Sequence, residues 1–178
     1  MAGEVLNEVG PQARKTSALG VLEALVLKSL EDPQCKHEIL ERIGKLRSDS
    51  SRRWGKMTAP QMVCHLNDAF LGVMGRKPIS VAPNMRARGL VKWIAIYAPV
   101  RWPKGVPTRP EFDAQIGGTP PSEFELDKQK LLGLVEEFTR QPRGFEFRPH
   151  PMFLEMTERE WMRWGYLHTD HHLRQFGQ

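Results

Sequence analysis

The C-terminal segment, residues 161–178, constrains the fold most because it combines a clear helix signal with a cluster of histidines. Three of the six histidines in the chain lie here, at positions 168, 171 and 172. Thr157 precedes Glu160 by three residues, the capping-box pattern that begins a helix, and no proline follows. Because each helical residue turns the chain by about 100°, His168 and His172 share one face at i and i+4. The sequence therefore predicts a terminal helix with two imidazoles that can point at a common atom.

Two imidazoles at this spacing are half of a metal site, which usually recruits a third ligand from elsewhere in the chain. The same face carries two tryptophans, a glycine and Gln175, so the rings are expected to be buried and to need partners. The alternative is that histidines near the end of a helix only complement its dipole, and His171, about 60° off the face, fits that interpretation. Thr169 excludes the HExxH motif of metalloproteases.

Length and composition place the chain among single-domain proteins. The chain has 178 residues, enough for one domain with a substantial core. Its two cysteines, Cys35 and Cys64, imply no disulfide framework. The apolar stretch of residues 18–30 is too short to span a membrane and is interrupted by Glu23. We therefore expect a cytoplasmic protein without a membrane span.

Apolar residues at helical spacing predict further helices. One covers residues 17–30, and the Asp32-Pro33 start predicts another that ends near residue 46. The capping box Thr58–Gln61 predicts a helix that ends near residue 74, and the capping box Ser122–Glu125 predicts one that ends near residue 139, with Leu126 in the core. No strand pattern is convincing. We expect an all-α fold, a four-helix bundle over residues 30–178 preceded by a partly helical extension over residues 1–29.

One histidine of the Thr58–Met74 helix is a candidate third ligand. His65 lies at the border of the apolar face of that helix. A lone histidine on such a face is more often a hydrogen-bonded core residue than a ligand, but here a pair of imidazoles lacks a partner. Asp68 is a candidate base or ligand-orienting group, although an exposed helix carboxylate is the slightly preferred interpretation. His150 is a candidate near the mouth of the site, and Gln175 is a candidate to orient His172.

A long irregular connection separates the second and third bundle helices. Residues 75–121 contain eight prolines, and only residues 90–98 have the pattern of a short helix. From residue 69 to residue 110 there is no Asp or Glu and there are eight basic residues, whereas the rest of the chain has 18 basic and 21 acidic residues. Such a segment is either a lid that attracts anions or a solvated surface. As a lid, it predicts salt-sensitive binding of an anionic compound that depends on Arg86, Arg88 and Lys92.

The segments WGKMTAPQMVCHLNDAF and YLHTDHHLRQFG resemble the DinB-like, or YfiT-like, superfamily of metalloenzymes, in particular a branch of unknown function that also has an HPMF-like segment before its last helix. The likeness covers residues 30–177 and is least clear over residues 75–121. The resemblance implies a four-helix bundle, usually dimeric, in which His65, His168 and His172 hold a divalent metal ion, Zn or Ni being the most favoured.

Two classes of function follow from these observations. The first is a metal-dependent enzyme acting on a small substrate as a homodimer. The resemblance implies thiol-dependent chemistry, such as that of an S-transferase, and the dimer; a metal ion with an open position also allows a hydrolase, and the basic segment favours an anionic substrate. The alternative is a non-enzymatic basic helical module that binds an anionic polymer or surface through residues 76–109. Nucleic acid is the less favoured partner.

Overall fold

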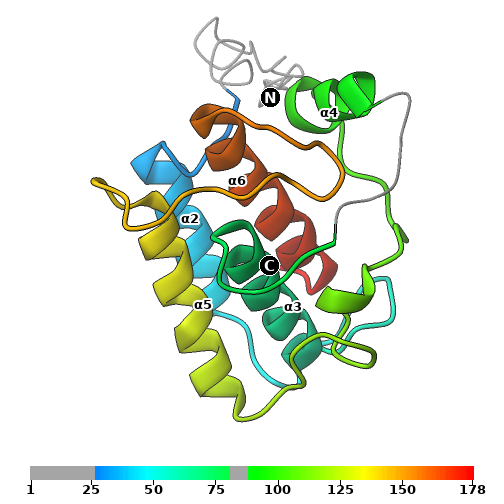
Figure 1. The fold of residues 1–178 in the computed structure, drawn as a ribbon. Coiled ribbons are helices and arrows are strands. Elements are labelled where there is room, and N and C mark those ends of the chain that lie inside the picture. Colours follow the sequence, from blue (N-terminus) through cyan, green and yellow to red (C-terminus); the bar gives the residue numbers. More distant parts are fainter. Residues whose placement is uncertain (1–26, 81–87) are drawn as a thin grey trace, which may run out of the picture.

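The computed structural model describes residues 27–80 and 88–178, which form an all-α fold. Within these two ranges there are five α-helices and no β-strand (Figure 1). None of these helices is long and apolar enough to cross a membrane. The helices, together with one 3₁₀ turn, are α2 (Pro33–Gly44), α3 (Ala59–Val73), α4 (Arg88–Tyr97), η1 (Pro110–Phe112), α5 (Phe124–Thr139) and α6 (Glu158–Gln175).

The four longer helices surround one core, and α4 lies outside them (Figure 1). Contacts join α2 to α5, α5 to α3, α3 to α6 and α6 to α2, so each of these helices touches two of the others. Helix α4 packs on α6. Phe70 of α3, Phe138 of α5 and Trp161 of α6 are almost fully buried at the centre. Gly165 lets α6 pack closely against Leu30, since a Cβ at this position would lie 2.7 Å from Leu30 Cδ1.

Local capping explains where most of these helices begin. Asp32 accepts hydrogen bonds from the first turn of α2, and both halves of the predicted capping boxes are present at Thr58 and Thr157. The predicted start of α5 is wrong. Its N-cap is Glu123, which makes no side-chain cap. Ser122, the predicted N-cap, instead donates its backbone N–H and its hydroxyl to the Asp127 carboxylate.

Two further expectations about the helices are corrected. Most of the helix predicted over residues 17–30, like most of the extension over residues 1–29, lies outside the described residues, and residues 27–30 are not helical. Leu126, expected in the core, is 62% exposed, whereas Leu131 of the same helix is fully buried. The reason is geometric: among the described residues, Leu126 lies on the solvent-facing side of α5.

Both ends of the long connection are tied to α3 through one buried carboxylate. Asp68 accepts hydrogen bonds from the backbone N–H and the hydroxyl of Thr119, both at 2.7 Å. Lys77 forms an ion pair with the same carboxylate at 2.7 Å. Lys77 is near the start of the connection and Thr119 is near its end. The carboxylate therefore closes residues 75–121 into a loop anchored on the helix that carries His65.

A candidate metal centre

Three histidines from two helices meet in the interior. His65 comes from α3, and His168 and His172 come from α6, with one ring nitrogen from each lying within 4.8 Å of the others. The Nε2 atoms of His65 and His168 are 3.2 Å apart. Two nitrogens bound to one tetrahedral Zn²⁺ ion lie roughly 3.3 Å apart, given Zn–N bonds of about 2.0–2.1 Å. The spacing of these two rings is therefore compatible with a shared ion.

Hydrogen bonds on the far side of two rings determine which nitrogen faces inward. His65 Nδ1 lies 3.2 Å from the carbonyl oxygen of Phe112, which can only accept, so Nδ1 carries the proton. The Gln175 amide donates to the carbonyl of Trp54, which turns its Oε1 towards His172 Nδ1 at 3.0 Å. His172 Nδ1 therefore also carries the proton. Each ring consequently presents the lone pair of its Nε2 to the cluster, as a metal-binding imidazole must.

The third ring is held by aromatic contacts. His168 lies against Trp164 and Trp102, at ring-centroid distances of 5.0 and 5.9 Å. Its Nδ1 atom is buried and has no hydrogen-bond partner among the described residues. Without an ion, the 3.2 Å contact with His65 is a hydrogen bond in which the His168 ring donates from Nε2. Of the three rings, His168 is the one that is partly accessible to solvent.

Burial keeps all three rings in the neutral form that can bind a metal. Removal from water lowers the pKa of His65, and it lowers the pKa of His168 and His172 well below the usual histidine value. The neighbouring imidazoles lower the pKa of His168 and His172 further, since each would repel a second positive charge. The cluster is therefore a set of three neutral nitrogen donors at neutral pH.

Aromatic residues from two connections pack beside the cluster. Trp102, from the long connection, lies over both His168 and His171, and its indole N–H donates to the carbonyl of Ala95 in α4. Trp54 contacts the other side of His171, and the Lys104 ammonium group is 4.5 Å from the centroid of the Trp54 ring. Sequence analysis did not identify these residues, because nothing local indicates that segments so distant in the chain meet α6.

Comparison with protein families gives one match. A family model described as "Protein of unknown function (DUF1569)" matches residues 27–178, which is most of the chain. The chain belongs to the DUF1569 family. Searches of curated proteins and of solved structures gave no match at the significance required. Every described element of this DUF1569 protein, from α2 to α6, falls within the matched residues.

Gln175 is expected to affect metal affinity through His172. We expect Gln175→Met, which has a similar shape but no amide, to weaken zinc binding by about 10- to 100-fold, because His172 loses the acceptor that orients it. Gln115→Met, at an exposed position, is the matched control and should bind zinc as the unmodified protein does. Competition titration against a chromogenic chelator measures both affinities, and equal affinities would contradict the orienting role.

Asp68 is buried in α3 and engaged by residues of the long connection. The preferred interpretation, an exposed helix carboxylate, is wrong, since Asp68 is 1% exposed. Both carboxylate oxygens are engaged, by Thr119 and by Lys77. Asp68 is not one of the residues whose side-chain atoms lie close enough together to share a metal ion. Its contacts describe an anchor of the long connection.

His150 is part of a tight turn. Its Nδ1 accepts hydrogen bonds from the backbone N–H groups of Met152 and Phe153, both at 3.2 Å, and its ring stacks on Phe153. The ring is buried and also contacts Trp161 and Trp164. Through Trp164 it supports one wall of the cluster, but it is not among the histidines that come together.

The buried His150 ring is expected to make stability depend on pH. Burial, with a smaller contribution from Arg109, lowers its pKa from 6.5 to about 3. Below pH 6.5 this histidine binds a proton in the unfolded chain but not in the folded chain. The free energy of unfolding therefore decreases by about 1.4 kcal/mol for each unit by which the pH is lowered. His150→Asn keeps an acceptor for the turn but removes this titration. We therefore expect urea unfolding to show a shallower pH dependence in the variant between about pH 6.5 and pH 5, and equal slopes would contradict this.

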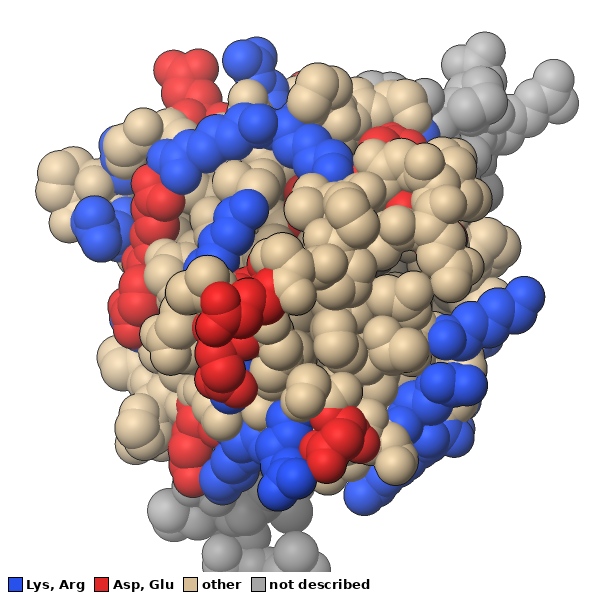
Figure 2. Space-filling view, turned by 90° about the horizontal axis from the view of Figure 1, so that it is seen from below, with Lys and Arg blue, Asp and Glu red and all other residues tan. Residues whose placement is uncertain are grey.

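Half of the basic segment is neutralised by ion pairs. Arg76 pairs with Glu137, Lys92 with Glu160 and Arg109 with Glu111, in addition to the pair of Lys77 with Asp68. Of the three residues on which the expected binding of an anionic compound depends, Lys92 is paired with Glu160, while the side chains of Arg86 and Arg88 lie outside the described residues. On the face in Figure 2, acidic groups accompany basic ones along one side, and a group of basic side chains lies along the opposite edge.

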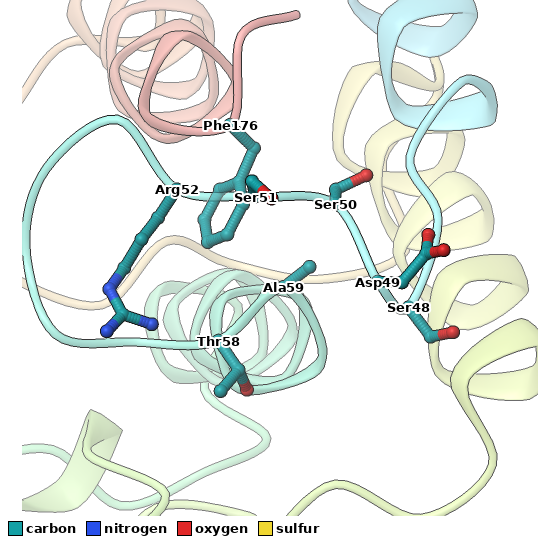
Figure 3. A pocket seen from close by; sticks show the side chains of 8 residues that line it. All are labelled: Ser48, Asp49, Ser50, Ser51, Arg52, Thr58, Ala59 and Phe176. Carbon is teal, nitrogen blue, oxygen red and sulfur yellow. The ribbon is translucent and has the colours of Figure 1, made fainter.

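A surface pocket of about 480 Å³ lies beside the first turn of α3 (Figure 3). Phe176, from the end of α6, and Arg52, from the connection between α2 and α3, border it. None of the three histidines lines it.

Cys64 also offers no reactive group. Burial, with the nearby Asp127, raises the pKa of its thiol to about 12. The histidine cluster is therefore the best-supported candidate for chemistry among the described residues.

Proposed function

We propose that this DUF1569 protein is a metal-dependent enzyme whose divalent ion is held by His65, His168 and His172. The observation that carries the proposal is the pair of hydrogen bonds from His65 Nδ1 to Phe112 and from His172 Nδ1 to Gln175. Both bonds leave an Nε2 lone pair directed into one buried cluster. Histidines buried only for packing would not require two rings to have the same Nδ1 hydrogen bond and the same inward Nε2. Imidazole donors suit zinc and nickel, among other metals.

The residues present can hold such an ion and leave it accessible. When bound, a divalent ion with three imidazole ligands supplies a Lewis acid with a position open to a water or a thiolate. In this chain Phe112 and Gln175 would orient two of the ligands. Trp102 and Trp164 would fix the third ring and limit water around it. This arrangement favours a hydrolase or a thiol-dependent S-transferase.

The proposal includes a DinB-like four-helix bundle formed by α2, α3, α5 and α6. It is supported by the closed set of contacts between these helices and by ligands on facing helices, as in other metal-binding bundles. A homodimer and a small anionic or thiol-bearing substrate belong to the same proposal. The Lys104 ammonium group, held over Trp54 beside His171, is the cation that would attract such a substrate.

The alternative function, an anionic-polymer-binding module, is less well supported. Of the eight basic residues between 69 and 110, four are in ion pairs with Asp or Glu. Paired charges release few counterions on binding a polyanion, so they contribute little to such affinity. The histidine cluster therefore supports the enzyme proposal better than the basic segment supports this alternative.

Elemental analysis of protein produced without a histidine tag tests the proposal. We expect about one divalent ion per chain after gel filtration in metal-free buffer, consistent with a single three-histidine site. Filter binding to single-stranded DNA at low and high salt is the companion measurement. Metal-free protein that also fails to bind added zinc would refute the enzyme proposal. If that protein bound DNA with a steep salt dependence, the alternative would be supported instead.

A further inference from the structure

Helix α4 carries an apolar surface on the side that faces away from the molecule. Leu90, Trp93, Ile94 and Tyr97 are spaced at i, i+3, i+4 and i+7, so they form one stripe along the helix. Leu90 is 62% and Trp93 is 57% exposed, and Val100, just beyond the helix, is 56% exposed. Together these residues expose an area on the order of a few hundred Å², the size that marks an interaction site in soluble proteins.

The opposite face of α4 is fully used by packing. Ile96 is buried, and its carbonyl accepts a hydrogen bond from the Arg163 side chain of α6. Lys92 forms an ion pair with Glu160 and donates to the carbonyl of Glu155. Trp102 donates to the carbonyl of Ala95. These contacts hold the helix against α6 (Figure 1) in one orientation. The apolar stripe is therefore a stable feature of the surface.

The charges around the stripe are basic. Arg101 and Lys104 follow it and are exposed, and the chain has no Asp or Glu between residues 69 and 110. Two acidic residues contact α4. Glu160 is buried, pairs with Lys92 and accepts from the Tyr97 hydroxyl, and Glu155 is exposed and meets Lys92 through its backbone carbonyl. Tryptophan and tyrosine on an apolar helix face flanked by Lys and Arg are typical of helices that lie in the headgroup region of a membrane.

From these observations we propose that α4 and residues 98–104 dock on an anionic lipid surface. Leu90, Trp93 and Ile94 would enter the boundary between headgroups and acyl chains. Arg101 and Lys104 would pair with anionic headgroups. The docking surface adjoins the histidine cluster, because Trp102 lies against His168 and Lys104 lies over Trp54. The proposal does not depend on a bound metal.

A second copy of the chain fits this surface less well. A stable interface buries about 800 Å² on each partner, more than one ten-residue helix and its flank expose. Two-fold pairing also brings the same patch together from both copies. Arg101 and Lys104 of one copy would then face those of the other, with no acidic residue in this part of the chain to offset them.

Vesicle flotation tests this proposal with the full-length protein. We expect the protein to float with vesicles of equal parts phosphatidylcholine and phosphatidylglycerol, and much less with phosphatidylcholine alone. The double variant Leu90→Ser/Trp93→Ser should lose at least about tenfold in affinity for the mixed vesicles, since both side chains leave water on docking. Arg101→Glu/Lys104→Glu should abolish the preference for anionic vesicles.

A matched control separates this effect from a general loss of surface apolarity. Leu126 and Ile116 are 62% and 72% exposed at other places on the surface, so Leu126→Ser/Ile116→Ser should float as the unmodified protein does. Far-UV circular dichroism confirms that each variant is folded. Absence of flotation, or equal flotation of the two serine variants, would overturn the proposal. So would a dimer in light scattering that Leu90→Ser/Trp93→Ser dissociates, which would assign the stripe to a second copy.

Discussion

Replacing His168 by alanine is expected to weaken zinc binding by on the order of a thousandfold. Zinc sites with four ligands bind with roughly 10–16 kcal/mol, so one ligand accounts for about 3–4 kcal/mol. His168 is also the ring whose Nε2 lies 3.2 Å from that of His65, so its loss opens the centre of the cluster. We expect His65→Ala and His172→Ala to have effects of similar size. Isothermal titration with zinc measures all three.

The exposed His37 provides the control for these variants. It is exposed on α2 and is not one of the three clustered histidines. His37→Ala should therefore leave zinc affinity unchanged. If His168→Ala retained one tightly bound zinc ion, the proposed triad would be wrong. His171, whose buried Nδ1 has no partner among the described residues, would then be the next residue to replace.

Replacing Phe138 by alanine is expected to lower the free energy of unfolding by about 3–5 kcal/mol. The ring is fully buried and contacts Phe70 of α3 and Trp164 of α6, at centroid distances of 5.0 and 6.2 Å. It also contacts Phe147 in the connection before α6. Truncation therefore leaves a cavity where three parts of the fold meet. Urea unfolding, followed by far-UV circular dichroism, measures the loss.

Leu126 provides the comparison on the same helix. It is 62% exposed, so Leu126→Ala should change the free energy of unfolding by no more than about 0.5 kcal/mol. Both variants introduce alanine into α5, so the difference between them reports the effect of burial and not that of helix propensity. A large loss at Leu126 with a small loss at Phe138 would show that the packing of α5 described above is wrong.

Interactions between residues close in the chain could be predicted from the sequence. The capping boxes at Thr58 and Thr157 form as predicted, because a hydroxyl and an amide or carboxylate three residues apart meet in any helix that starts there. The pairing of His168 with His172, and of His172 with Gln175, follows from the same periodicity. The start of α5 was predicted wrongly because Ser122 had a competing local partner, Asp127, which lies outside the capping-box pattern.

Interactions between distant segments were decided by the tertiary structure. The Phe112 carbonyl that orients His65, and the Trp102 ring that covers His168, come from a connection without the periodicity that predicts contacts. Likewise, Lys77 and Lys92 looked like free cations in the sequence, yet they pair with Asp68 and Glu160. A buried carboxylate needs a partner, but the sequence does not say which cation the folded chain brings to it. Helical periodicity thus determined which side chains share a face, while packing of the long connection determined the surroundings in which those side chains act.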